Sequence, residues 1–320
     1  MGNTRSGHDL VLREMPHKVR DLHYAVMSND RDTVCSLVQQ GVNVNFPWFN
    51  PSNPSIKDGS TPLICAVSLN HTDIIQLLLH AGAYINKCDR NGCTPIYKAA
   101  FHGRPTLIEL LAKAGADVNL ADYMGKTPLY ICVNNAIVHT GSCKLAVQKL
   151  IKGGAIVDKS DKNGQAPLHI ASHWKLREVM QMLINVKANV NIADRKGRTP
   201  LWVCVSSLST KLYAEDLRHQ FPCILTLFRN GADMLNLTEW ILFKGPGIPE
   251  DLLKSAPDFE AWYFLQVTQP MTLKNICRKV IQKCVSSKGD MVDICIKLPL
   301  PHSVQKVLFR RMFYREQRPP

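Results

Sequence analysis

A three-residue motif recurs along the chain at nearly constant spacing, and this periodicity limits the fold more than any other feature of the sequence. Thr-Pro-Leu or a close variant begins at residues 61, 94, 127, 166 and 199, so the intervals are 33, 33, 39 and 33 residues. A second landmark, Gly-Ala, follows at residues 82, 115, 154 and 231. Repetition with a period of this length predicts a stack of similar units that bury a shared core.

Each repeated position suits one element of a helix–turn–helix unit. The hydroxyl of Thr61 can accept a hydrogen bond from a helix N-terminus, and Pro62 fits the first helical position because it lacks an N–H. Apolar residues three and four apart, as in residues 74–79, predict the buried face of a second helix. The glycines of the second landmark suit a left-handed helix end. The Asp-x-x-Gly segments at 89–92 and 122–125 predict turns.

This pattern resembles the ankyrin repeat, in which a turn, a Thr-Pro-Leu-His segment and two antiparallel helices form one unit. The resemblance implies about six repeats over residues 18–235, in an all-α dominated solenoid with β-hairpin loops. The sequence also departs from the pattern. The His of the motif is present only at His23 and His169, and Lys187 replaces the Gly of the second landmark. Insertions are predicted at residues 46–57, 134–143 and 206–219.

The net charge of the 320 residues is +13, but the basic residues concentrate near one end. Residues 271–320 hold 11 Lys or Arg against 3 Asp or Glu, so most of the excess lies there. A nucleic-acid binder is therefore the weaker interpretation, and we expect no nucleic-acid partner. No apolar run reaches the roughly 18 residues that a membrane helix needs. We expect no export signal, a reducing compartment and free thiols for the 11 cysteines.

The period ends after residue 236, and a different pattern follows. Residues 236–270 are rich in aromatics and prolines, which predicts a packed connector rather than a flexible linker. A helix is then predicted, because apolar residues recur three and four apart at Leu273, Ile276, Cys277, Val280 and Ile281. A second short motif follows at Leu298, Pro299, Leu300 and Pro301. From periodicity alone, the helix serves equally well as a cap on the stack or as a docking surface for a partner.

The order of these pieces resembles the SOCS box, which follows the repeats in the ankyrin repeat and SOCS box family. The resemblance covers residues 271–313, followed by a tail at 314–320, with residues 1–17 as an N-terminal segment. It implies that the predicted helix binds elongin B/C and that residues 298–301 bind cullin-5 with its RING subunit. The function implied is the non-catalytic substrate-recognition adaptor of a ubiquitin ligase. An ankyrin scaffold or inhibitor with no ligase role remains the alternative.

Candidate target-binding residues lie at the predicted turns and in the first insertion. The turn residues expected to be exposed are Arg90, Tyr123, Met124, Lys126, Lys162, Arg195, Lys196 and Arg198. Their positive charge favours an acidic epitope on an unknown protein substrate, although solubility alone is a sufficient reason for it. Trp48 and Phe49 are predicted either to anchor a partner or to fold back over the first repeat.

We expect no catalytic residues, no metal and no cofactor. Gly125-Lys126-Thr127 is similar to the end of a phosphate-binding loop, but Leu120 stands where that motif needs a glycine. His169 and His173 are spaced for a shared metal but lack a third ligand. Gly2 fits a myristoylation pattern, which implies weak membrane association if it is acylated. The expected location is cytoplasmic, with the nucleus as an open alternative and no integral membrane contact.

Overall fold

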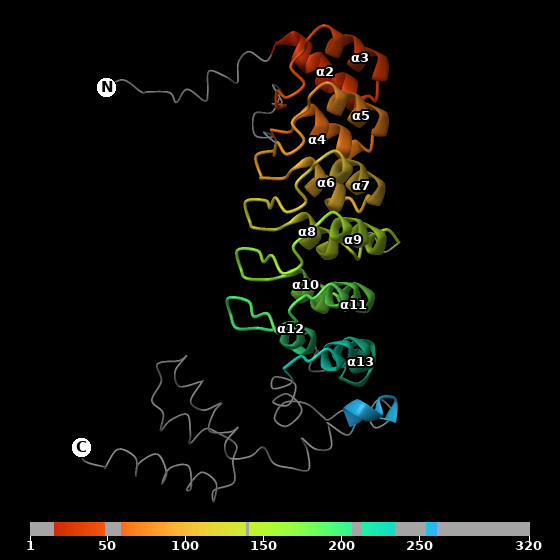
Figure 1. The fold of residues 1–320 in the computed structure, drawn as a ribbon, viewed down its shortest axis with the longest axis vertical. Helices are drawn as coiled ribbons and strands as arrows, with labels where there is room; N and C mark the ends of the chain where they lie inside the picture. Colours follow the sequence, from red (N-terminus) through yellow and green to blue (C-terminus); the bar gives the residue numbers. More distant parts are fainter. Residues whose placement is uncertain (1–15, 49–58, 139–140, 207–212, 234–253, 261–320) are drawn as a thin grey trace, which may run out of the picture. The chain divides into compact units, whose positions relative to one another are not determined.

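Pairs of antiparallel helices follow one another along the described part of the chain (Figure 1). The computed structural model describes residues 16–48, 59–138, 141–206, 213–233 and 254–260. The chain divides into two compact units, Met1–Pro246 and Gly247–Pro320. The helix pairs belong to the first unit. In the second unit, residues 257–260 are helical, and Ala256 and Phe259 are buried.

Six helix pairs match the six predicted repeats. The first helices of the pairs are α2 (His17–Met27), α4 (Pro62–Leu69), α6 (Pro95–Phe101), α8 (Pro128–Asn134), α10 (Pro167–His173) and α12 (Pro200–Ser206). The second helices are α3 (Arg31–Gln39), α5 (Thr72–His80), α7 (Pro105–Lys113), α9 (Cys143–Lys152), α11 (Arg177–Asn185) and α13 (Tyr213–Arg229). Each first helix contacts the next one along its row, and α7, α9, α11 and α13 contact each other in succession. The stack therefore has two rows of helices, one of first helices and one of second helices.

The Thr at the start of α4, α6, α8 and α12 acts as a helix cap, as predicted, whereas α2 has no side-chain cap. Thr61 Oγ1 accepts a hydrogen bond from the Ile64 amide at 3.3 Å, and Thr94 and Thr127 cap α6 and α8 in the same way. Where Ala166 replaces the Thr, His169 Nδ1 accepts the Ala166 amide at 3.1 Å. His169 thus caps the amide of Ala166 itself, whereas the His169 amide, which a Thr hydroxyl would otherwise accept, donates to the Ala166 carbonyl at 2.9 Å.

The core of the stack consists of one apolar residue after another at equivalent repeat positions. The leucine or isoleucine of each motif is at most 1% exposed, which applies to Leu63, Ile96, Leu129, Leu168 and Leu201. Small residues at Ala66, Ala99 and Ala171 are fully buried and allow neighbouring helices to approach closely. Because burial of apolar surface stabilises by roughly 25 cal/mol per Å², these repeated contacts supply much of the stability of the stack.

The predicted β-hairpins are tight turns rather than strands, and no strand occurs in the described residues. The Asp89 amide donates to the Cys93 carbonyl at 3.0 Å, and the Asp122 amide donates to the Lys126 carbonyl at 2.9 Å. In each of these turns the aspartate side chain accepts two further amides, so the hydrogen bonds are those of a turn rather than of a strand ladder. Among the described helices, none is both long and apolar enough to cross a membrane.

Candidate protein-interaction surface

An aspartate carboxylate, buried at Asp89, Asp161 and Asp194 and half-buried at Asp122, organises each of four successive turns that project beside the first helices. Asp89 Oδ1 accepts hydrogen bonds from the Asn91 and Cys93 amides, both at 2.9 Å. The same two-amide arrangement recurs at Asp122, Asp161 and Asp194, with distances of 2.8 to 2.9 Å. These bonds satisfy the amides of the turn and fix its shape.

Each turn is also hydrogen-bonded to the next one. The Tyr123 amide donates to the Asn91 carbonyl at 3.0 Å, and the Lys162 amide donates to the Met124 carbonyl at 2.9 Å. A third link joins the Arg195 amide to the Asn163 carbonyl at 3.0 Å. The four turns therefore form one continuous edge, which we call the turn edge: residues 89–92, 122–125, 161–164 and 194–197.

Tyrosines at the motif's His position tie the first helices to this edge. Tyr97 Oη donates to Asp122 Oδ2 in the following unit at 2.9 Å, and Tyr130 Oη approaches Asp161 Oδ2 at 3.4 Å. Burial and then the hydrogen bond to Asp122 raise the pKa of Tyr97, while burial and the charge of Asp161 raise the pKa of Tyr130. Both phenols therefore remain protonated donors at neutral pH. In the sequence, these tyrosines differ from the His that the repeat pattern has at the same position.

His169 makes the same connection with different chemistry. Because its Nδ1 accepts the Ala166 amide, the proton must lie on Nε2, which donates to the Arg198 carbonyl at 2.8 Å. Burial lowers the pKa of His169 and favours this neutral form. Both ring nitrogens are occupied, so His169 cannot join His173 in binding a metal. Within the described ranges, no group of His, Cys, Asp or Glu side chains is arranged to hold a metal ion.

A second set of hydrogen bonds joins the units where the second helices end. Asn119 Nδ2 donates to the Gly154 carbonyl at 3.0 Å, and its Oδ1 accepts the Ile156 amide at 2.7 Å. Asn45 and Asn191 make the equivalent pair of bonds to their following units. Together with the turn edge, these amides hold neighbouring repeats in a fixed register.

The structure separates the predicted target-binding residues into two groups. The exposed ones are Arg90, Tyr123, Met124, Lys162, Arg195 and Lys196, and all of them lie on the turn edge. Tyr123 and Met124 are 60% and 53% exposed, which is high for apolar side chains. Lys126 is half-buried, with Nζ 5.9 Å from the ring centre of Tyr130.

Arg198, by contrast, makes a structural contact within its own turn. Its guanidinium donates to Asp194 Oδ2 from both Nε, at 2.7 Å, and Nη2, at 2.6 Å. The same group lies 5.3 Å from the ring centre of Trp202. Arg198 therefore stabilises its own turn, and the basic side chains that face solvent there are Arg195 and Lys196.

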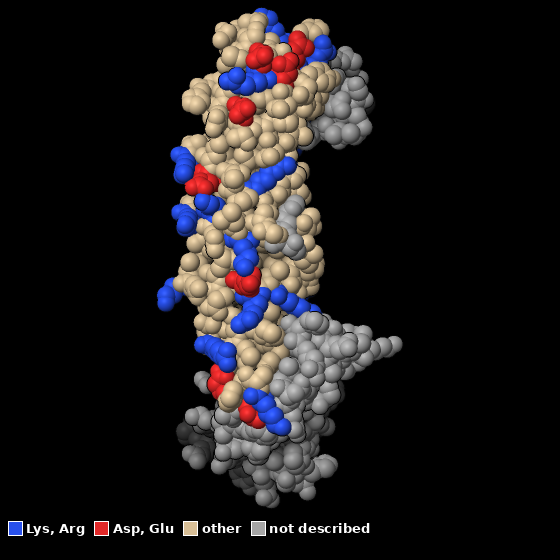
Figure 2. Space-filling model, turned by 90° about the vertical axis from the view of Figure 1, so that its right-hand side faces the viewer, with Lys and Arg blue, Asp and Glu red and all other residues tan. Residues whose placement is uncertain are grey.

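Apolar side chains also lie at equivalent C-terminal ends of the first helices. Leu69 ends α4, Phe101 ends α6 and Trp174 follows α10, with exposures of 45%, 41% and 38%. On the side of the second helices, basic and acidic residues are instead interspersed over a largely uncharged surface (Figure 2). The turn edge and the ends of the first helices are therefore the most distinctive surface of the described stack.

Trp48 folds back over the first repeat, which was one of the two alternatives for the first insertion. Its ring centre lies 5.2 Å from that of His23 and 5.4 Å from that of Tyr24, and its amide donates to the Ser60 carbonyl at 2.7 Å. Phe49 lies outside the described residues. So do Gly2, the predicted elongin-binding residues from Leu273 to Ile281, and the predicted cullin-binding residues Leu298 to Pro301.

Comparison with known proteins identifies the repeats. A family model described as ankyrin repeats (3 copies) matches residues 22–122, 81–145 and 136–235, which together cover two thirds of the chain. This chain belongs to the ankyrin-repeat family. The ankyrin match ends at residue 235, and no SOCS-box family model matches the chain.

Two curated relatives match a shorter stretch of the chain. Rabankyrin-5 of Mus musculus is 38% identical over 72 residues, and Rabankyrin-5 of Homo sapiens is 36% identical over 72 residues. Each match covers 21% of this chain and only 6% of the relative. The likeness is therefore confined to a short part of this chain and a still smaller part of each relative. Ankyrin-repeat proteins are generally non-catalytic scaffolds, and these repeats are modules for protein–protein interaction.

Proposed function

We propose that this ankyrin-repeat protein is the substrate-recognition adaptor of an elongin B/C–cullin-5–RING ubiquitin ligase. The repeats bind the target protein, and residues 271–313 dock the ligase subunits. The observation that carries the proposal is the order of motifs: an ankyrin array, then Leu273-x-x-x-Cys277, then Leu298-Pro299-Leu300-Pro301. Each motif alone is weak, but their order and spacing resemble one family.

The turn edge supports a role in holding a target. Its backbone is fixed by the aspartate and inter-turn hydrogen bonds, so its exposed side chains are held in place before binding. A surface that is already ordered loses less conformational entropy when a partner binds. The basic side chains of Arg195 and Lys196, with Tyr123 and Met124 nearby along the edge, fit an acidic target that also offers apolar contacts.

The sequence pattern supports docking by the C-terminal segment. Leu273, Ile276, Cys277 and Val280 have the spacing by which an amphipathic helix fills a partner's groove. The contribution of such an adaptor to the reaction is proximity: it holds the target beside the activated ubiquitin and raises their effective concentration. No catalytic group is required of the adaptor itself.

Affinity capture of the full-length chain from cells tests this function. The wild-type chain is expected to recover elongin B, elongin C and cullin-5. Leu273→Asp with Cys277→Asp is expected to lose the elongins, because a carboxylate cannot enter an apolar groove without a large desolvation cost. Replacement of Leu298 to Pro301 by alanine is expected to reduce cullin-5 while the elongins remain. Lys279→Ala, on the basic side of the predicted helix, is the matched control.

A scaffold or inhibitor with no ligase role is the second candidate, and the same experiment separates the two. If the last helices only cap the stack, the Leu273 and Cys277 variants lower thermal stability but remove no partner. If the wild-type chain is stable but recovers no elongin, the ligase role is rejected. The ankyrin array is then the functional part.

A further inference from the structure

The insertion between α8 and α9 brings two cysteines together. Cys132 lies in α8, and Cys143 is the first residue of α9 after the inserted segment. The Cys143 thiol donates to the Cys132 carbonyl at 3.7 Å, and the two thiols are within hydrogen-bonding reach of each other. Both residues are buried, with exposures of 2% and 3%, so they share one small environment inside a single repeat.

The pKa values of the two thiols are shifted in opposite directions by their surroundings. A hydrogen bond from the Cys132 thiol lowers the pKa of Cys143, although burial opposes this shift. The position of Cys143 at the N-terminus of the ten-residue helix α9 also favours a thiolate. The hydrogen bond to Cys143 and then burial raise the pKa of Cys132. The hydrogen bond between the thiols and the helix N-terminus therefore favour a thiolate at Cys143 over one at Cys132.

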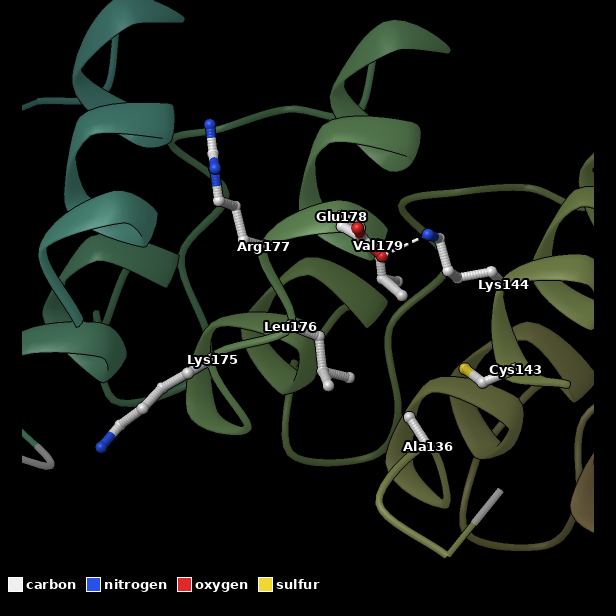
Figure 3. Close-up of a pocket in the computed structure, with 8 residues that line it drawn as sticks. All are labelled: Ala136, Cys143, Lys144, Lys175, Leu176, Arg177, Glu178 and Val179. Carbon is white, nitrogen blue, oxygen red and sulfur yellow. Dashed lines mark ion pairs between the residues drawn. The ribbon is translucent and has the colours of Figure 1, made fainter. Parts of the chain in front are cut away.

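A cavity gives small molecules a route to Cys143. It has a volume of about 330 Å³ and lies between α9 and the start of α11. Figure 3 shows the Cys143 sulfur pointing into the space lined by Ala136 and Leu176. An ion pair between Lys144 and Glu178 crosses one side, while Lys175 and Arg177 extend away from the sulfur. The space is sufficient for a small polar oxidant, since one water occupies about 30 Å³ in the liquid.

A second buried pair provides an internal comparison. Cys204 lies in α12 and Cys223 in α13. The two residues are close enough for a negative charge on Cys223 to raise the pKa of Cys204. Burial raises the pKa of Cys204 to about 12 and also raises the pKa of Cys223. In the second pair, burial outweighs the opposing positive charges of Lys175 and Arg177 and favours the protonated form of both thiols. The combination at Cys143 of a neighbouring thiol, a helix N-terminus and an open cavity is what distinguishes the first pair.

We propose that Cys143 is a site of oxidation by peroxides and that Cys132 is its resolving partner, so that the two residues form a reversible disulfide within the repeat. The oxidant is a hydroperoxide of the size of hydrogen peroxide, which the cavity admits. The product joins α8 to α9 across the insertion and consumes both thiols.

The reaction balances with one peroxide and no further reactant. The Cys143 thiolate attacks one peroxide oxygen, the O–O bond breaks, and a sulfenic acid and hydroxide form; the hydroxide takes up the proton that the thiol released, giving water. The Cys132 sulfur then attacks the Cys143 sulfur, the S–S bond forms and the S–O bond breaks. The departing hydroxide takes the Cys132 proton, giving a second water. Two thiols are oxidised, and the peroxide is reduced.

Peptide mapping of the full-length chain after treatment with hydrogen peroxide tests the proposal. The reduced protein is freed of reductant, oxidised, blocked with N-ethylmaleimide and digested without reduction. A peptide linked through Cys132 and Cys143 is expected by mass spectrometry, and dithiothreitol is expected to remove it. It should form at least about tenfold faster than any Cys204–Cys223 link, because thiolate content controls the first step.

Two variants separate the roles. Cys132→Ser keeps a hydrogen-bond donor beside Cys143 but cannot resolve it, so a dimedone adduct of sulfenic acid should accumulate at Cys143. Cys143→Ser should leave Cys132 as a free thiol under the same treatment. The proposal is overturned if peroxide leaves Cys132 and Cys143 unlinked in the folded wild-type chain, or if Cys132→Ser yields no adduct at Cys143 while its circular dichroism matches the wild type.

Discussion

The phenol of Tyr97 donates a hydrogen bond to Asp122 of the next repeat at 2.9 Å, across a separation of 25 residues. Asp122 also accepts the Met124 and Lys126 amides of its own turn. One carboxylate therefore joins the first helix of one repeat to the turn of the next. The stability of the turn edge depends on contacts of this kind as well as on apolar burial.

Removal of the Tyr97 hydroxyl is expected to destabilise the stack. Tyr97→Phe preserves the buried ring but deprives Asp122 of a donor, which should lower the free energy of unfolding by about 1–2 kcal/mol. Urea denaturation followed by circular dichroism measures this change. Tyr84→Phe is the control, because Tyr84 is 65% exposed and should lose nothing measurable. Equal stability of the Tyr97 and Tyr84 variants would show that the inter-repeat bond contributes little.

Lys187 occupies a backbone conformation that favours glycine. Its φ is +69°, whereas the equivalent Gly82 and Gly154 have φ values of +81° and +89°. A side chain in this left-handed region costs roughly 1–2 kcal/mol, and Lys187 is exposed and contributes no core packing. Lys187→Gly is therefore expected to raise the free energy of unfolding by about 1 kcal/mol, measured by urea denaturation. Lys187→Ala retains a Cβ and should change stability little; an equal gain from both substitutions would assign the effect to the lost charge instead.

Local features of the fold could be predicted from the sequence, because each depends on residues close together in the chain. The caps at Thr61, Thr94 and Thr127 and the positive φ at the repeat glycines follow from the motif alone. The six pairs of helices follow from the period. These features require only the stereochemistry of helix ends, which is the same in every protein.

Features that depend on distant partners could not be predicted in the same way. The bond from Tyr97 to Asp122 exists only once neighbouring repeats are stacked. The proximity of Cys132 and Cys143 depends on where the insertion returns to the stack. The docking residues from Leu273 to Pro301 stay a prediction, because they lie outside the described residues.

The buried imidazole of His169 is expected to make stability depend on pH. Burial lowers its pKa in the folded state below the ordinary value of 6.5, so the unfolded chain binds a proton more readily. Stability should therefore be full above pH 6.5 and decline as the pH falls below that value. Thermal unfolding scans of the wild type between about pH 7.5 and 5 measure this decline.

Separate substitutions of two histidines on α10 show whether His169 causes this pH dependence. His169→Gln removes the titrating group, so its melting temperature should change less with pH than that of the wild type, even though its stability at neutral pH is lower. His173 is exposed at the end of α10, and His173→Gln should leave the wild-type pH dependence intact. An unchanged slope in His169→Gln would place the origin of the pH dependence elsewhere in the chain.

Reversal of charge on the turn edge tests whether it binds an acidic target. Arg195→Glu with Lys196→Glu changes two exposed side chains without touching Arg198, whose ion pair with Asp194 stabilises the turn. Target recovery in affinity capture should fall at least about tenfold, since like charges at an interface repel and slow association. Lys152→Glu with Lys187→Glu makes the same change in net charge at exposed positions outside the turn edge, so it should retain the target. Equal recovery by both double variants would mean that the basic residues of the turn edge serve solubility, and that recognition lies with apolar side chains such as Tyr123 and Met124.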